Sequence, residues 1–260
     1  ADNHFLLKGD VSLQDLSHPQ DAYIFGNLSN LYADPDGIAF FVRNLSKDYK
    51  GVPPALQHLG TISFRGEISG YFTDLVTYGE VRTDIGTVKT DVKFSSDKEK
   101  GYFSYSGAVK TAEFELGKLL ANDKFGKVTF NMDVKGSHYA KRYPSVTMKG
   151  LVASIDYSDY TYENITLDGE YKQGGFNGNV SFDDENGAIQ LNGSINTAGK
   201  IPTFNFRADV DHFRPNTLHL TPKYKDTEIS VKIKADFTGS SINDMNGEIN
   251  IDSLQYTAPD

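Results

Sequence analysis

Cysteine and tryptophan are both absent from the 260 residues of this chain. The absence of cysteine excludes disulfides, thiolate zinc sites, iron–sulfur clusters and cysteine nucleophiles. Basic residues are scarce relative to acidic ones, because 26 Lys and Arg against 35 Asp and Glu leave a net charge of −9. Nucleic acids bind to basic surfaces, so this balance predicts no nucleic-acid partner.

Long apolar runs and catalytic motifs are absent as well. No stretch approaches the roughly 18 consecutive apolar residues that indicate a transmembrane helix. The chain has no HExxH zinc pair, no GxSxG nucleophile elbow, no Walker lysine and no dinucleotide fingerprint. The acidic clusters at 34–36 and 183–185 lack the spacing of an EF-hand loop and fit helix caps or turns better. We therefore predict a non-enzymatic protein with no catalytic residue, no cofactor and no metal site.

Alternation of apolar and polar residues is the dominant pattern that is present. Between residues 204 and 210, Phe204, Phe206 and Ala208 fall on one side, and Asn205 and Arg207 on the other. This period of two is typical of strands with one apolar face. Similar runs lie at 5–13, 62–68, 103–109, 128–134, 146–152, 165–171, 189–195 and 231–237. The pattern predicts an all-β protein built on a long, mainly antiparallel sheet.

Small residues recur in the middle of the apolar side of these runs. Examples are Gly66, Gly169 and Gly193, with Ala208 and Ala235 at equivalent places. Glycine inside a strand usually marks bending or close approach of another backbone. Two interpretations remain open: the small residues leave volume for a groove, or they alternate with large residues in ordinary packing between two sheets.

Helices are few. Asp34 followed by Pro35 is a typical helix start, and Ile38 continues the helical spacing, so we expect an amphipathic helix at about 35–45. Shorter helices are expected at 54–59 and 116–121. Residues 1–60 are therefore interpreted as strands plus one helix, and residues 61–260 as one continuous, repetitive β-sheet domain. We also expect the chain to be a segment of a longer protein.

Several segments resemble one family. The strand-and-glycine segments of the TamB family, which belongs to the AsmA-like group of envelope proteins, are similar to residues 60–70, 83–92, 114–120, 162–171, 235–239 and 247–252. The resemblance covers most of the chain from about residue 60 onward. It implies a sheet rolled lengthwise into an open, β-taco-like trough with an apolar interior.

The resemblance also implies a location and partners. A TamB-like parent protein is anchored in the inner membrane of a Gram-negative bacterium and crosses the periplasm. It takes part in phospholipid transport between the two membranes, in outer-membrane protein assembly, or in both. The expected partners are phospholipid acyl chains or unfolded outer-membrane β-strands. Contact with an outer-membrane barrel of the Omp85 type would belong to parts of the parent that this chain does not contain.

The candidate lipid groove consists of the apolar and small residues on the expected inner side of the strands. These residues are Phe64, Gly66, Ile68, Phe103, Tyr105, Val128, Phe130, Met148, Leu167, Gly169, Leu191, Gly193, Phe204, Phe206, Ala208, Val231, Ile233 and Ala235. Their neighbours Arg65, Asp168, Arg207 and Lys232 are expected on the outer side.

Two other protein classes show the same alternation and remain alternatives. A transmembrane β-barrel needs strands of about 9–11 residues with aromatic girdles, and the alternating runs here are mostly shorter. A β-sandwich adhesin or carbohydrate-binding module would bury its apolar faces between two sheets and place its ligand residues on loops.

Overall fold

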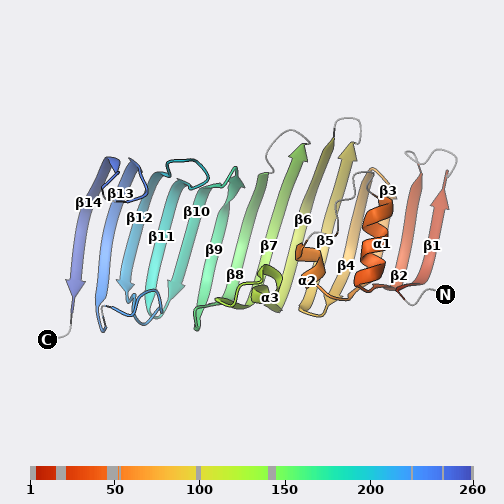
Figure 1. Cartoon of the computed structure of the whole chain (residues 1–260), viewed down its shortest axis with the longest axis horizontal. Coiled ribbons are helices and arrows are strands. Elements are labelled where there is room, and N and C mark those ends of the chain that lie inside the picture. The colour runs from red at the N-terminus through yellow and green to blue at the C-terminus, as the bar shows by residue number, and fades with distance from the viewer. Residues whose placement is uncertain are drawn as a thin grey trace. The chain divides into compact units, whose positions relative to one another are not determined.

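The computed structural model describes residues 4–15, 22–45, 52, 54–97, 101–139, 145–223, 225–241 and 243–258. These residues form fourteen strands and three short helices (Figure 1). The strands are β1 (Phe5–Gln14), β2 (Tyr23–Ala33), β3 (Ile62–Tyr71), β4 (Asp74–Thr83), β5 (Gly86–Asp97), β6 (Tyr102–Glu115), β7 (Phe125–Tyr139), β8 (Ser145–Tyr157), β9 (Tyr160–Lys172), β10 (Gly175–Asp184), β11 (Gly187–Asn196), β12 (Thr203–Phe213), β13 (Glu228–Thr238) and β14 (Asn246–Thr257). The helices are α1 (Pro35–Leu45), α2 (Pro54–His58) and α3 (Leu116–Leu120). The predictions of an all-β chain and of these helices are confirmed.

The strands form one sheet whose order follows the sequence from β1 to β14. The pairs of neighbouring strands whose register is described are antiparallel, as predicted. Among the described residues, β1 pairs only with β2 and β14 only with β13, so the sheet is open at both edges. No second sheet is present in the described part of the chain, which contradicts the two-sheet packing of a β-sandwich.

The strands contain 10 to 15 residues and are therefore mostly longer than the alternating runs of the sequence. The reason lies in the backbone, whose hydrogen bonds do not depend on an alternating side-chain pattern. For example, β5 continues beyond its apolar run through Ser95 and Ser96, which lie opposite Ser104 and Phe103 of β6.

The chain divides into two compact units, residues 1–129 and residues 130–260. Strands β2 and β3, which lie on either side of residue 60, pair directly within the first unit. We call the two compact units unit 1 and unit 2 and describe each by itself.

In unit 1, helix α1 begins where the sequence predicts it. The Gly37 amide donates a hydrogen bond to Asp34 Oδ1 at 2.9 Å, which caps the first turn. Asp34 Oδ2 also lies 2.7 Å from His4 Nδ1. The amide and the imidazole together hold the pKa of the Asp34 carboxyl below its usual range. The cap thus ties the helix to the residue that precedes β1.

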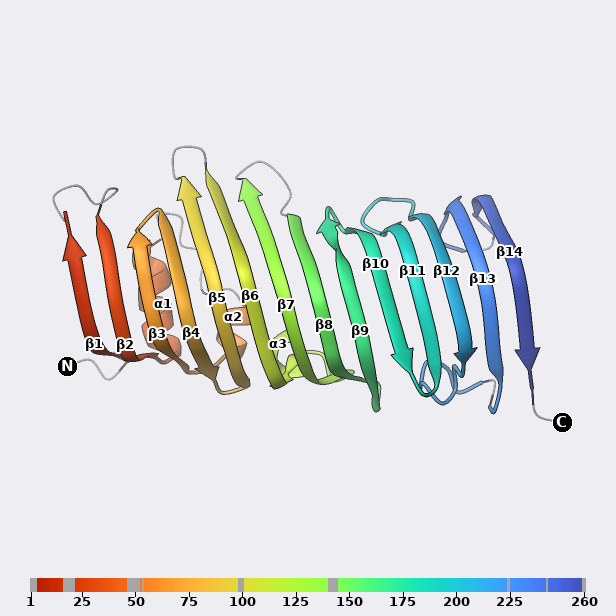
Figure 2. The same ribbon diagram turned by 180° about the vertical axis from the view of Figure 1, so that it is seen from behind.

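The helices of unit 1 lie on one face of its strands. Figure 1 shows α1 in front of β3, and Figure 2 shows it behind this strand. Ile38 of α1 is buried, as are Leu28 of β2, Phe64 of β3 and Val92 of β5. Helices α2 and α3 contact each other, and the His58 ring donates from Nδ1 to the Leu119 carbonyl at 2.8 Å. The helices therefore cover part of the apolar side of unit 1.

Unit 2 has no helix among its described residues. Instead, the segment between β12 and β13 folds back against the ends of nearby strands. Leu218 of this segment is fully buried, and its carbonyl accepts a 2.6 Å hydrogen bond from the Tyr162 hydroxyl of β9. In the described chain as a whole, none of the helices is both long enough and apolar enough to cross a membrane.

Candidate functional site

In unit 2, strand register gathers the apolar residues into rows that run across the strands. One row joins Leu167, Val180, Leu191, Ala208 and Ile233, each directly opposite the next. Residues that lie directly opposite in an antiparallel pair point to the same face of the sheet. The row therefore forms one continuous apolar band across five adjacent strands, β9 to β13.

Parallel rows complete this apolar face. The next row runs through Met148, Gly169, Gly178, Gly193, Phe206 and Ala235. Phe204 and Val231 lie in two further rows, where Phe204 stacks on Phe237 with ring centroids 4.7 Å apart. All of the groove candidates of β8 to β13 thus share one face of unit 2. Their neighbours Asp168, Arg207 and Lys232 lie on the other face, as alternation predicts.

In unit 1, the candidates also share a face. Phe64, Gly66 and Ile68 lie on one face of β3. The strand pairings of β3 with β4, β4 with β5 and β5 with β6 place Phe103 and Tyr105 of β6 on the same face. Phe103 stacks on Phe94 of β5 at 6.2 Å. The two candidates of β7 fall on either side of the unit boundary: Val128 is buried in unit 1, and Phe130 begins unit 2.

Apolar side chains of both units range from buried to exposed. In unit 1, Phe64 is 8% exposed and Phe103 is 42% exposed. In unit 2, Ala235 is buried, most other apolar side chains of this face are half-buried, and Ile251 at the edge is 56% exposed. No helix is described in unit 2, so no helix of this unit covers its apolar face. The apolar face of unit 2 is therefore partly open to solvent.

The glycines of this face do not provide groove volume. At Gly193, φ is +144°, and a Cβ atom would lie 2.5 Å from the Cα of Phe206 on β12 and closer still to the Asn205 carbonyl oxygen. The space beside Gly193 is thus filled by the backbone of the neighbouring strand. The interpretation that the small residues leave volume for a groove therefore does not hold at Gly193, because a side chain there would first contact backbone.

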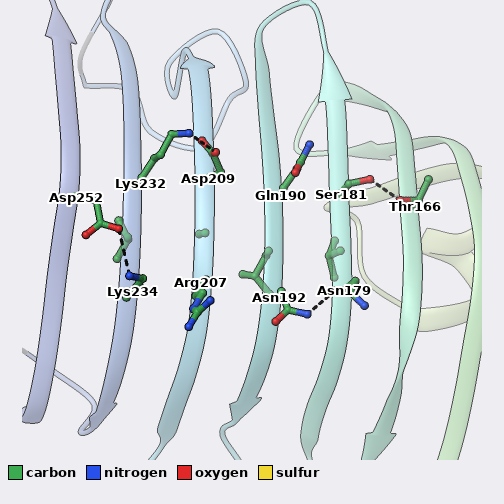
Figure 3. Close-up of a pocket in the computed structure, with 14 residues that line it drawn as sticks. Thr166, Asn179, Ser181, Gln190, Asn192, Arg207, Asp209, Lys232, Lys234 and Asp252 are labelled. Carbon is green, nitrogen blue, oxygen red and sulfur yellow. Dashed lines mark hydrogen bonds and ion pairs between the residues drawn. The ribbon is translucent and has the colours of Figure 1, made fainter.

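The opposite face of unit 2 is polar and held by cross-strand pairs (Figure 3). Lys232 and Asp209 form an ion pair at 2.8 Å, and Lys149 donates to Asp168 at 2.8 Å. In each case the hydrogen bond to the carboxylate, followed by its charge, raises the lysine pKa. Because these pairs are exposed, we expect each to contribute little to stability.

Three shallow cavities lie on this polar face. Their volumes are about 610, 580 and 370 Å³. Each cavity shares lining residues of β11 to β13 with the next one in this order. Gln190 and Asp209 line the first two, and Asn192 and Arg207 line the last two. The cavities therefore adjoin one another along the strands. They lie on the polar face, to which the sequence analysis assigned no function.

A cluster around Tyr160 closes one end of the strands of unit 2. The Tyr160 hydroxyl donates to Asp184 Oδ1 at 2.5 Å and accepts from Asn186 Nδ2 at 3.1 Å, and its ring packs edge-on against His219. Burial, followed by the hydrogen bond to Asp184, raises the Tyr160 pKa to about 12. The phenol is thus a structural anchor that stays protonated at neutral pH.

The arrangement provides two broad surfaces on opposite faces of unit 2. Among the residues that the structure describes, no three His, Asp or Glu side chains lie close enough together to hold a metal ion. The perturbed pKa values belong to caps, turns and cross-strand pairs. What the site can do chemically is bind: apolar molecules on one face and polar molecules on the other.

Sequence reasoning missed the docked segment and the polar-face cavities. Leu218 lies in a short run between Pro215 and Pro222 whose alternation covers only Leu218 and Leu220, so it was not counted with the core. Arg207 and Lys234 follow the alternation, but only the register shows that they are neighbours. The pair Leu218 and Leu220 in a segment with two prolines was the available signal for the docked segment.

Comparison of the chain with protein families, with curated proteins and with solved structures found no match. The resemblance to the TamB family therefore stays a hypothesis, and the functional argument depends on the geometry of the two faces.

Proposed function

We propose that the apolar face binds lipid acyl chains and that the protein acts without catalysis, as a trough-like segment in the periplasm of a Gram-negative bacterium. One observation carries the proposal: the apolar rows of unit 2 run unbroken across β9 to β13 and remain partly exposed. Contiguous exposed apolar surface is uncommon on soluble proteins and marks binding surfaces for apolar partners.

An acyl chain suits this surface better than an unfolded polypeptide does. Each methylene that leaves water contributes about 0.8 kcal/mol and needs no hydrogen-bond partner. A polypeptide strand laid on the same side chains would leave its backbone N–H and C=O groups without partners. The proposal therefore commits to phospholipid acyl chains. Transport between the inner and outer membranes, with a parent protein anchored in the inner membrane, is the use that the TamB resemblance favours.

The test compares a charge on the apolar face with the same charge on the opposite face. Leu191→Arg places a cation in the central apolar row, and Gln190→Arg, one residue away, places it on the exposed polar face opposite Asp209. Binding is measured with the fluorescent fatty acid cis-parinaric acid, and folding by circular dichroism and urea unfolding. We expect Leu191→Arg to stay folded and lose binding, and Gln190→Arg to keep both.

Crosslinking adds a direct readout. A photoreactive amino acid at position 167 or 206 is expected to yield phospholipid adducts by mass spectrometry, and one at 168 or 207 is not. If the unmodified chain binds no fatty acid and Leu191→Arg abolishes folding, the face is covered in solution and the proposal fails.

A further inference from the structure

The polar face of unit 2 carries two cations side by side. Arg207 of β12 lies directly opposite Lys234 of β13, and Figure 3 shows both side chains on the same face. Like charges directly opposite each other in an antiparallel pair are destabilising. The sheet thus contains a repulsion that an external anion would relieve.

In the cavity of about 580 Å³, the cations Arg207, Lys232 and Lys234 outnumber the carboxylates Asp209 and Asp252. The adjoining cavity of about 370 Å³ is lined by Asp236 and Glu248 as well as by Arg207 and Lys234, so only the larger cavity has an excess of positive charge.

Asp209 pairs with Lys232 at 2.8 Å, and Asp252 lies 3.6 Å from Lys234. Arg207 has no ion pair and no side-chain hydrogen bond within the described part of the chain. Its guanidinium therefore keeps its full set of donors, arranged in the planar fork that suits phosphate or carboxylate.

The two cations border a cavity with hydroxyl-binding groups. Arg207, Lys234 and Asn192 line both the cavity of about 580 Å³ and the adjoining one of about 370 Å³, and Gln190 lines the larger. Asn192 donates one amide hydrogen to Asn179 Oδ1 (Figure 3). Its second N–H and its carbonyl oxygen still supply a donor and an acceptor together, which matches a hydroxyl group. The described residues that line the larger cavity include no aromatic ring, so the cavity offers no stacking surface for a nucleobase.

We infer that this cavity binds an anionic saccharide. Arg207 and Lys234 hold the phosphate or carboxylate group, and the amides of Asn192 and Gln190 hold hydroxyl groups of the sugar. Because the cavity lies on the polar face, its ligand is separate from the acyl chains proposed for the apolar face. Loss of one activity leaves the other in place.

The test uses the whole chain and separates charge from hydroxyl recognition. Binding of glucose 6-phosphate, glucuronate, glucose and inorganic phosphate is followed by NMR titration of the backbone amides. We expect glucose 6-phosphate and glucuronate to shift amides of β11 to β13, and to bind more tightly than either glucose or inorganic phosphate. Arg207→Gln should weaken that binding by about tenfold or more, as loss of a hydrogen bond to a charged group does.

Lys149→Gln is the matched control. It removes the same charge from the same face, but Lys149 pairs with Asp168 and does not line the cavity. It should leave binding unchanged, and Arg207→Gln should leave the thermal midpoint unchanged or raise it. The inference fails if no anionic sugar binds, if inorganic phosphate binds as tightly as glucose 6-phosphate, or if Arg207→Gln and Lys149→Gln weaken binding equally.

Discussion

Gly193 and Phe206 lie directly opposite each other on β11 and β12, so close that the glycine has no room for a side chain. A Cβ atom on Gly193 would lie 2.5 Å from the Phe206 Cα and 2.8 Å from its Cβ. The backbone of Gly193 also has φ of +144°, which side-chain-bearing residues rarely adopt. The pair shows that the glycines within this sheet serve close strand approach.

Replacing Gly193 by alanine should therefore destabilise the sheet. We expect Gly193→Ala to lower the free energy of unfolding by about 1–3 kcal/mol, the typical cost of a residue held in a sparsely populated backbone region. Urea unfolding measures the change. Gly199→Ala is the control, because a Cβ there would come no nearer than 3.3 Å to another residue's atom. Equal stability of the two variants would show that the glycine row tolerates side chains.

The stacked rings of Phe204 and Phe237 should be energetically coupled. Their planes differ by 18° and their centroids are 4.7 Å apart. A double-mutant cycle with leucine at each position should give a coupling energy of about 0.5–1.5 kcal/mol, which is typical of aromatic pairs. A coupling near zero would mean that the two rings contribute only through the area that they bury.

Leu218 should anchor the segment between β12 and β13. Because its side chain is fully buried, we expect Leu218→Ala to cost about 2–5 kcal/mol of unfolding free energy. Leu220→Ala is the matched control, since Leu220 is 50% exposed. Hydrogen exchange of residues 214–223 should accelerate in the first variant alone. Unchanged exchange in Leu218→Ala would contradict docking through this side chain.

Tyr160 should ionise at higher pH than an ordinary tyrosine. Its pKa is raised from 10.0 to about 12, so the folded state holds the phenol proton more tightly than the unfolded chain does. The corresponding stabilisation is complete below pH 10 and is lost as pH rises from 10 to about 12. The difference in ultraviolet absorbance between the wild type and Tyr160→Phe, followed against pH, should have its midpoint near 12. A midpoint near 10 would mean that the hydroxyl is solvated.

Much of the fold was predictable because it depends on local rules. The pleat of a strand sends successive side chains to opposite faces, so alternation alone placed Leu167, Leu191 and Ile233 together and Asp168 opposite them. The start of α1 followed from Asp34 and Pro35, whose chemistry acts within one turn. These features need only residues that are close in sequence.

The remaining features depend on which residues meet across strands. Alternation is the same for every even shift of register, so it did not say that Arg207 faces Lys234 or that Gly193 faces Phe206. The tertiary structure made these choices through backbone hydrogen bonds between strands. It also buried Leu218 but left Leu220 exposed, although the two leucines lie in the same short segment. The amino-acid pattern thus determined which side chains lie on each face of the sheet. Tertiary packing determined how much of the apolar face is covered and which charged residues are neighbours on the polar face.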